Sequence, residues 1–234
     1  SGLGGSGRSS LAGAIAEKRG SEPIAAGGVF RDLARERGLS VAEFGELAEK
    51  DITIHALIDV RQKESAKTRD NIVVEGRLSG WMVEDADLRI WLNAPIACRA
   101  KRIANRDGMD EYTARDLTLQ REESERTRYR NYYKIEIDDL TPYHLAMNSE
   151  LWSGEALAAI ASAGSLAELD AVRVAYLGKK GSLTAVLRSL SDLSPEERPA
   201  VGKAANEVRT ALEAALEERH AALSASALAE RVTA

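Results

Sequence analysis

The chain has 234 residues, of which 44% are hydrophobic and 29% are charged, and its formal net charge is −5. This apolar share is enough for a folded core and excludes disorder throughout. No run of about 18 apolar residues occurs, so we expect no transmembrane helix and no membrane partner. The negative charge gives no global attraction to nucleic acid, so we expect no DNA partner, and any polyanion site must be local.

The chain contains a single cysteine, Cys98, which excludes an internal disulfide and a cysteine-ligated zinc site. Cys98 lies in the apolar stretch 94–98, where we expect a buried, inert thiol. No charged segment followed by an apolar one opens the chain, so we expect no secretory signal. Together these features predict a cytoplasmic protein.

The part of the chain before Trp152 carries both helical and strand patterns. They predict helices, or helix and turn, over 11–19 and 24–37, a helix opened by the capping box of Ser40 and Glu43, parallel strands over 71–75 and 88–92, a long charged helix over about 111–132, and a last strand near 145–148. Beyond Trp152 the only aromatic residue is Tyr176, and β-rich runs disappear. We therefore predict an α/β domain over 1–152 and a helical domain over 153–234.

The chain opens with a glycine-rich segment, Ser1-Gly2-Leu3-Gly4-Gly5-Ser6-Gly7-Arg8-Ser9-Ser10, which fits the phosphate-loop pattern with Arg8 in place of the usual lysine. Glycines let successive amides turn inward around a phosphate, and the following helix adds its N-terminal dipole. A flexible tail is the alternative, but an amphipathic helix starts at once with Leu11. We predict that the Ser9 hydroxyl is a Mg²⁺ ligand and that ATP is bound by Gly2, Gly4, Gly5, Ser6, Gly7, Arg8, Ser9 and Ser10.

A phosphate loop normally follows a central buried strand, and the sequence given begins at Ser1. Each buried aliphatic residue of such a strand contributes about 1.5–3 kcal/mol, a large share of the ~5–15 kcal/mol net stability of a domain. We therefore expect a parallel sheet whose first strand is missing from the sequence given. Upstream residues, another segment or another chain would fill that place.

Several separate segments of the first part resemble the archaeal-type cytidylate kinases, a branch of the P-loop nucleoside monophosphate kinases. They are 1–10, 26–31, 36–40, 43–45, 86–92, 94–95, 135–140 and Glu75-Gly76-Arg77-Leu78-Ser79-Gly80-Trp81-Met82. Members of that family often lack the loop lysine, so Arg8 is compatible with membership. The resemblance implies an α/β P-loop kinase fold and ATP-dependent phosphorylation of CMP or dCMP, with Mg²⁺ and ATP as cofactors and small-molecule nucleotides as partners.

The resemblance also implies roles for individual residues. The acceptor nucleotide is assigned to Phe30, Arg31, Arg61, Gly76 and Arg77, and Glu75 is expected to act with Ser9 at Mg²⁺. These assignments suit the chemistry, because phosphoryl transfer requires two polyanions to be held in line and neutralised. For Arg61 and Arg77 a structural ion pair is the alternative.

An arginine-rich stretch over 99–130 is expected to form a lid over the transferred phosphoryl group. The lid candidates are Arg102, Arg106, Arg121 and Arg128, and the residues assigned to catalysis are Arg8, Arg77, Arg121 and Arg128. Three glutamates, at 122, 123 and 125, interleave with these arginines. A solvated helix face with i,i+4 ion pairs is therefore the alternative.

The sequence departs from the family at two places. His55-Ala56 stands where an Asp-Arg pair is usual, which weakens the expected acceptor site, and His144 stands where an aspartate is usual. The histidines, His55, His144 and His220, are far apart and lack ligand spacing, so we assign none of them to catalysis.

Beyond Trp152 the apolar spacing predicts an antiparallel hairpin, in which 165–190 pairs with a helix of about 35 residues, roughly 50 Å long, that starts at Ser194-Pro195. The strings 172–181 and 195–202 resemble the N-terminal coiled-coil arm of the bacterial phenylalanyl-tRNA synthetase alpha subunit. In that family the arm contacts tRNA, and the catalytic domain lies further along, so we expect no synthetase activity. Lys179 and Lys180 are predicted to contact RNA phosphates, with a solvated turn as the alternative.

Three functions follow from these patterns. The first is a CMP or dCMP kinase with an appended helical arm. The second is a tRNA-binding arm carried on a kinase-like body that does not turn over. The third is an engineered fusion in which either part is a scaffold, and the sequence does not separate a natural fusion from an engineered one.

Overall fold

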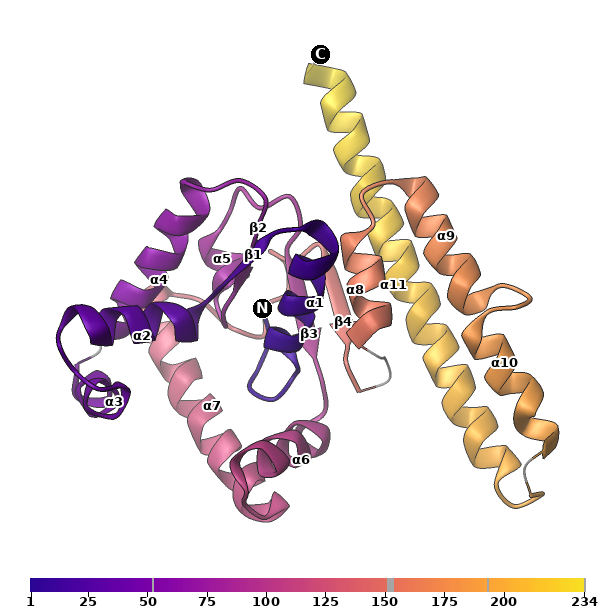
Figure 1. Cartoon of the computed structure of the whole chain (residues 1–234), viewed down its shortest axis with the longest axis horizontal. Coiled ribbons are helices and arrows are strands. Elements are labelled where there is room, and N and C mark those ends of the chain that lie inside the picture. The colour runs from indigo at the N-terminus through magenta and orange to yellow at the C-terminus, as the bar shows by residue number, and fades with distance from the viewer. Residues whose placement is uncertain (52, 151–153, 193, 234) are drawn as a thin grey trace.

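The computed structural model describes residues 1–51, 53–150, 154–192 and 194–233 (Figure 1). The strands are β1 (Glu22–Ala25), β2 (Ile72–Glu75), β3 (Ile90–Asn93) and β4 (Leu145–Asn148). The helices are α1 (Arg8–Arg19), α2 (Ala26–Glu36), α3 (Val41–Lys50), α4 (Thr53–Lys67), α5 (Ser79–Met82), α6 (Ile96–Asp107), α7 (Glu111–Tyr133), α8 (Gly154–Ser162), α9 (Leu166–Leu177), α10 (Ser182–Arg188), the 3₁₀ helix η1 (Ser189–Asp192) and α11 (Arg198–Thr233).

The strands form two parallel pairs. β1 pairs with β2 so that Ala25 lies opposite Glu75, and β3 pairs with β4 so that Asn93 lies opposite Asn148. Parallel pairing requires crossover connections, and these contain helices α2–α4 in one pair and α6–α7 in the other. The strands expected near 71–75, 88–92 and 145–148 are therefore confirmed, as is the long charged helix before the last of them.

The glycine-rich segment begins beside β3. The Leu92 amide donates a hydrogen bond to the Ser1 carbonyl at 2.9 Å, and Gly2 forms a parallel bridge with Leu92. Within the described residues, no strand ladder joins the β1–β2 pair to the β3–β4 pair. Residues 1–2 thus lie along β3, directly before the loop, at the place where a central strand is expected.

The expectation of a helix over 24–37 is wrong at its start, because Ile24 and Ala25 belong to β1 and α2 begins at Ala26. Gly20 ends α1 in the left-handed conformation with φ 60°. Pro23 has no amide to donate, which suits the edge position of β1. Residues 22–25 form a strand because they pair with β2, and the apolar periodicity of one segment does not reveal its pairing partner.

Two expected helix starts have different outcomes. The capping box at Ser40 is confirmed, since the Glu43 amide donates to Ser40 Oγ at 3.2 Å and the Ser40 amide donates to Glu43 Oε2 at 2.8 Å. The last helix starts later than expected, at Arg198. Residues 195–197 form a turn in which the Glu197 carboxylate accepts from the Ser194 hydroxyl at 2.9 Å.

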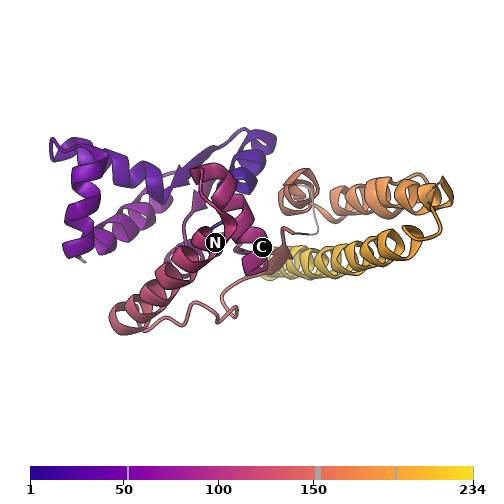
Figure 2. The same cartoon turned by 90° about the horizontal axis from the view of Figure 1, so that it is seen from below.

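The largest apolar cluster contains residues from both predicted domains. α8 packs along α1, and α11 packs against β4, α8 and α9. Its buried members include Leu11, Ile15, Leu92, Leu145, Met147, Leu157, Ile160, Leu169, Leu212 and Leu216. Figures 1 and 2 show α9 and α10 along one limb and α11 returning beside them, with the α/β part on the other side of α8. The expected antiparallel hairpin is present, and it shares a core with the α/β part.

Polar contacts add to this junction. The Ala146 amide of β4 donates to Glu218 Oε2 of α11 at 3.2 Å, so the helix satisfies a donor on the edge of the sheet. Arg219 is buried and donates to the Ala163 carbonyl, just past the end of α8, at 2.6 Å. Both contacts fix α11 relative to the α/β part.

Cys98 lies on α6 and is half-buried, so the expectation of a fully buried thiol is wrong. The stretch 94–98 begins in the core at Ala94, but α6 turns Cys98 partly toward solvent. Among the helices described, none combines the length and apolar character needed to cross a membrane.

Candidate active site

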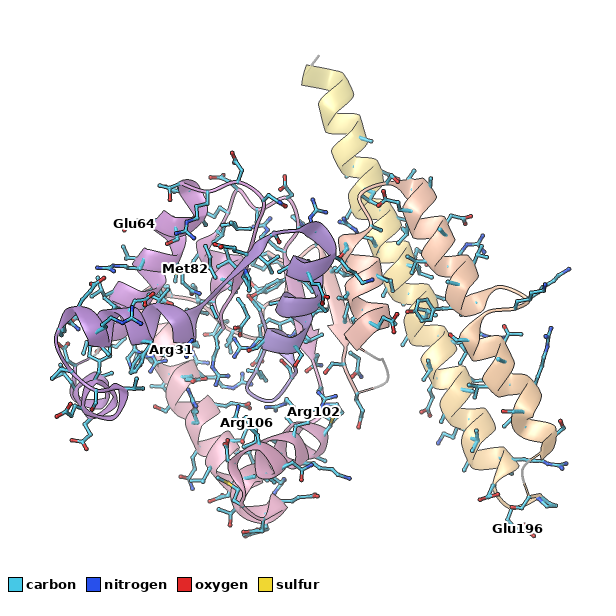
Figure 3. The ribbon with its side chains drawn as sticks, in the orientation of Figure 1. Arg31, Glu64, Met82, Arg102, Arg106 and Glu196 are labelled. Carbon is cyan, nitrogen blue, oxygen red and sulfur yellow. The ribbon has the colours of Figure 1, made fainter. Side chains whose placement is uncertain are left out.

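A cavity of about 1890 Å³ opens beside the glycine-rich loop. Loop residues 4–10 line it, together with side chains from α2, α4, α6 and α7 and with Gly154 and Leu157 of α8. Arg31 of α2 and Arg102 and Arg106 of α6 lie on different sides of this space (Figure 3). The structure thus gathers residues predicted for the donor and for the acceptor around one cavity.

Two glycines give the loop its shape. Gly5 and Gly7 adopt left-handed conformations with φ 77° and 89°, and a Cβ on Gly5 would lie 2.7 Å from the Arg99 carbonyl oxygen. Gly7 is the N-cap of α1, and no side chain caps this helix. The first amides of α1 therefore remain available at the cavity, where they and the helix dipole favour an anion.

Three successive loop carbonyls accept hydrogen bonds from residues outside the loop. The contacts are Arg99 Nη1 to Gly4 O at 3.1 Å, Arg102 Nη1 to Gly5 O at 3.3 Å, and Ser149 Oγ to Ser6 O at 2.6 Å. Anchored carbonyls hold the loop in one shape and leave its amides for a ligand. No sequence pattern points to Arg99 and Ser149, because their role depends on the packing of α6 and the end of β4 against the loop.

Arg99 and Arg102 therefore act as supports for the loop. Arg99 is buried and forms an ion pair with Glu122 of α7, so α6 and α7 are joined beneath the loop by a neutralised pair. Arg102 was a lid candidate from the sequence, but it also donates to the Ser149 carbonyl at 2.7 Å. Glu122 and Glu125 are both buried, so the interleaved glutamates do not simply form a solvated face.

Arg8, Ser9 and Glu75 lie together at the centre of the site. Ser9 Oγ donates to Glu75 Oε2 at 3.3 Å, and Arg8 Nη1 lies 3.4 Å from Glu75 Oε1. Glu75 is the last residue of β2, so the strand delivers its carboxylate to the cavity. A hydroxyl and a carboxylate are the oxygen ligands that Mg²⁺ takes alongside water and phosphate oxygens. The chemistry of Ser9 and Glu75 therefore fits a magnesium ion.

Arg77 and Arg121 share one buried carboxylate. Arg77 Nε lies 2.7 Å from Glu125 Oε2, and Arg121 Nε lies 3.0 Å from Glu125 Oε1. Arg77 Nη1 is buried without a hydrogen-bond partner among the described residues, and burial lowers the pKa of Arg77. The Arg77 guanidinium also lies next to Gly4 of the loop. It is thus held at the cavity with unused donors, as an anion site requires.

Phe30 and Arg31 of α2 line another wall of the cavity. The Phe30 ring packs on the buried Phe44, with ring centroids 4.7 Å apart. Arg31 is exposed and forms no ion pair within the part of the chain that the structure describes. Its guanidinium is therefore free to bind a phosphate.

Arg61 and Gly76 are not brought to the cavity. Arg61 forms a two-point ion pair with Glu36, at 2.6 and 2.7 Å, on the outer side of α4. This is the structural ion pair that the sequence left open as the alternative. At Gly76 a side chain would have no space, because a Cβ there would lie 2.9 Å from Gln62 Oε1. The glycine makes room for the buried Gln62, which donates a hydrogen bond to the Glu75 carbonyl at 2.9 Å.

The face of α4 that lines the cavity carries His55, Ile58, Asp59 and Gln62. These positions recur at spacings of three and four residues, so they share one side of the helix, and Arg61 lies on another. None of these four residues was predicted as a site residue from the sequence. Helical spacing alone could have indicated them, but Arg61 was predicted instead of its neighbour Gln62 because a guanidinium suits a phosphate.

The remaining arginines lie at different parts of the cavity. Arg128 lies over the Tyr129 ring, 5.1 Å from its centroid, and its Nε is buried without a partner among the described residues. Arg128 also lies close to His55, whose pKa is lowered first by burial and then by this charge. Arg106, at the rim, forms an ion pair with Asp107 at 2.6 Å.

Lys179 and Lys180 lie far along the chain from the cavity, in the loop between α9 and α10. Both are exposed, and neither forms an ion pair with another described residue. They do not contribute to the cavity lining.

The cavity thus combines a glycine-rich loop before a helix, a strand-end carboxylate and several arginines, which is the set of groups that phosphotransferase chemistry requires. The family model described as "Cytidylate kinase-like family" matches residues 1–151. The chain belongs to the cytidylate kinase-like family, which confirms the first resemblance drawn from the sequence. The chain is therefore an enzyme of the nucleotide kinase class.

Individual relatives agree with this family. The chain is 54% identical to "Cytidylate kinase" of Methanoregula boonei and 55% identical to that of Methanoculleus marisnigri, each over 70% of this chain and 90% of the relative. It is 46% identical to "Cytidylate kinase" of Pyrococcus horikoshii, over 74% of this chain and 88% of the relative. The first match spans 164 of the 234 residues of this chain. Any stretch of that length within the chain includes α8 (Gly154–Ser162), so α8 belongs to the matched part.

The second family model is described as "Aminoacyl tRNA synthetase class II, N-terminal domain" and matches residues 164–232. It covers α9, α10 and α11, so the second resemblance is also confirmed. A crystal structure of a protein from Eubacterium ventriosum superposes with a TM-score of 0.44 at 17% identity, over 63% of this chain and 85% of that chain. That similarity is too low to add to the assignment of the fold.

Proposed function

We propose that this chain transfers the γ-phosphoryl group of ATP to CMP, or to dCMP, and releases ADP and the nucleoside diphosphate. One observation carries the proposal. The loop, Glu75 and Arg77 line one cavity with Arg31, which forms no ion pair with another described residue, so two phosphorylated ligands can meet there. The identity to several cytidylate kinases supports the choice of acceptor.

In this reaction a phosphate oxygen of CMP forms a bond to the γ-phosphorus, and the bond to the β–γ bridging oxygen breaks. The protein needs to place the two ligands in line and neutralise charge, with little covalent chemistry of its own. We assign the donor phosphates to the amides of Gly5, Gly7 and the start of α1, and to Arg8. We assign the acceptor phosphate to Arg31 and Arg77.

Ser9 and Glu75 would hold Mg²⁺ at the donor phosphates. When bound, the ion supplies positive charge between the β- and γ-phosphoryl groups. Glu75 also lies beside Arg8, so the carboxylate keeps that guanidinium in place before a nucleotide arrives. Arg121 and Arg128 stay as candidates for charge stabilisation from α7.

The direct test measures ADP and CDP formation from Mg-ATP with CMP, dCMP, UMP and AMP in turn. We expect CDP and ADP in equal amounts with CMP, and no ADP release when the acceptor is omitted. Absence of ADP release with every nucleoside monophosphate would contradict the proposal and favour the reading in which the kinase-like part is only a carrier.

For the helical arm we propose RNA binding as a second function, with tRNA as the partner. The match of residues 164–232 favours it, and so does the exposed pair Lys179 and Lys180, which have no acidic partner among the described residues. We also propose that the arm begins after α8, near residue 164. The packing of α8 on α1 and its place within the match to the kinases support this boundary.

Titration with tRNA at two salt concentrations tests the second function. We expect Lys179→Ala/Lys180→Ala to weaken binding and to reduce its salt dependence by about two ion equivalents. Lys203→Ala is the matched control, because Lys203 has an acidic neighbour, Glu207, at 3.9 Å. Equal binding by the double variant and the parent would remove these lysines from the proposal.

A further inference from the structure

Asp59 is a carboxylate in a cavity whose other functional groups bind phosphate. It lies on α4, lines the cavity, and is held by a hydrogen bond from the Tyr133 hydroxyl to Asp59 Oδ2 at 2.8 Å. Its other oxygen, Oδ1, has no hydrogen-bond partner among the described residues. A carboxylate repels a phosphate, so Asp59 suits a part of the acceptor that is uncharged and donates hydrogen bonds.

The surroundings of Asp59 suit a flat, apolar ring with a polar edge. Phe30, Ala48 and Ile58 line the same cavity, and Phe44 supports Phe30 from behind. Burial raises the pKa of the Asp59 carboxyl, while the Tyr133 hydroxyl and Arg128 act in the opposite direction. The hydroxyl therefore fixes the orientation of the group and favours its charged form.

We propose that Asp59 selects cytosine, by accepting a hydrogen bond at Oδ1 from the exocyclic amine of the acceptor base. This inference rests on the proposed function and adds the residue that sets the base preference. Cytosine presents an amine at this edge, where uracil presents a carbonyl oxygen that would face the carboxylate without a proton between them. Pairing of an aspartate with the cytosine amine is worth about 10- to 100-fold in discrimination.

The first experiment compares kcat/KM for CMP and UMP in the parent, in Asp59→Asn and in Tyr133→Phe. The asparagine keeps the size of the side chain but can present an amide donor to the uracil carbonyl. We expect the ratio of CMP to UMP to fall at least about 10-fold in Asp59→Asn, with KM for ATP unchanged. Tyr133→Phe retains the carboxylate but removes the bond that orients it, so its ratio should fall by less than in Asp59→Asn.

The second experiment keeps the inference testable if Asp59→Asn does not fold. It uses the parent enzyme with a CMP analogue whose base is pyrimidin-2-one, which lacks the exocyclic amine. We expect kcat/KM to drop about 10-fold or more against CMP in the parent, and less than about 3-fold in a folded Asp59→Asn. A contact with the ribose instead would leave the analogue as good a substrate as CMP.

The two proposals fail in different ways. A parent enzyme that phosphorylates no nucleotide contradicts the proposed function. A parent enzyme that phosphorylates CMP, and for which the analogue or the Asp59→Asn variant leaves the base preference unchanged, contradicts only the role of Asp59.

Discussion

Glu125 lies between two cavity arginines, Arg77 and Arg121. Its carboxylate neutralises Arg77 and is itself buried, with an exposed fraction of 5%. A phosphate that reached Arg77 would compete with this carboxylate for the same guanidinium. Glu125 therefore neutralises Arg77 inside the protein, and Arg121 on the solvent side gives the same carboxylate a second cationic partner.

Substitution of Arg77 separates its two roles. We expect Arg77→Ala to lower kcat/KM for CMP by about 100-fold or more, since a phosphate ligand is lost. We also expect a loss of about 1–3 kcal/mol in the free energy of unfolding, because Glu125 loses its buried partner. Steady-state kinetics and urea denaturation measure the two effects.

A double variant, Arg77→Ala/Glu125→Gln, provides the control. Removing the Glu125 charge, which among the described residues only Arg121 would still partner, should restore part of the stability and none of the activity. Recovery of activity in the double variant would mean that Arg77 serves only to neutralise Glu125.

The predicted magnesium ligands have their own test. We expect Glu75→Gln to raise the free Mg²⁺ concentration needed for half-maximal rate by about 10-fold or more, because a neutral amide is a weaker ligand than a carboxylate. Initial rates against free Mg²⁺ at fixed ATP measure this. Glu64→Gln, on the exposed outer side of α4 (Figure 3), should leave the Mg²⁺ dependence unchanged. Equal curves for Glu75→Gln and the parent would remove Glu75 from the metal site.

At the scale of single elements, the loop that opens α1 depends on backbone conformation more than on side chains. Gly5 has φ 77° and lies against the backbone of α6, so any Cβ would be strained and would press on Arg99. Gly13, in the middle of α1, has nothing within 4 Å of a Cβ built on it. The two glycines therefore offer a matched pair of substitutions.

We expect Gly5→Ala to destabilise the protein by about 1–3 kcal/mol and to abolish ATP binding, since the loop must shift. Gly13→Ala should stabilise it by about 0.5–1 kcal/mol, because alanine favours the helix. Thermal denaturation and calorimetric titration with Mg-ATP measure both. Normal ATP binding by Gly5→Ala would show that the loop conformation is not what binds the phosphates.

At the scale of the whole molecule, the helical arm and the kinase part share one core. Leu212 and Leu216 of α11 pack in the same cluster as Leu145 of β4 and Leu157 of α8. Leu157 also lines the cavity, and α8 lies along α1, the helix that follows the glycine-rich loop. The arm is therefore part of the support of the site, although no described residue beyond Leu157 lines the cavity.

This arrangement predicts that damage within the arm reaches the kinase part. We expect Leu216→Ala to cost about 2–5 kcal/mol and to lower the unfolding temperature reported by tryptophan fluorescence, because every tryptophan precedes the arm. Val186→Ala, at an exposed position of α10, should change stability by less than about 0.5 kcal/mol. A helix signal that shifts in circular dichroism while the tryptophan transition stays fixed would show that the arm unfolds independently.

Local patterns in the sequence determined the glycine-rich loop, the charged helix α7, the strand ending at Glu75, the membership of the cytidylate kinase-like family, and the resemblance of residues 164–232 to a synthetase N-terminal domain. Each depends on residues close together in the chain, where turn chemistry, helical spacing and side-chain type act directly. Tertiary structure decided the pairing of β1 with β2, and for this reason Ile24 lies in a strand where the sequence predicted a helix. It also decided that Arg61 pairs with Glu36 while Asp59 and Gln62 meet the cavity, and that α11 packs on β4. These depend on which surfaces meet in three dimensions, and contacts between distant segments are not encoded in the periodicity of either one.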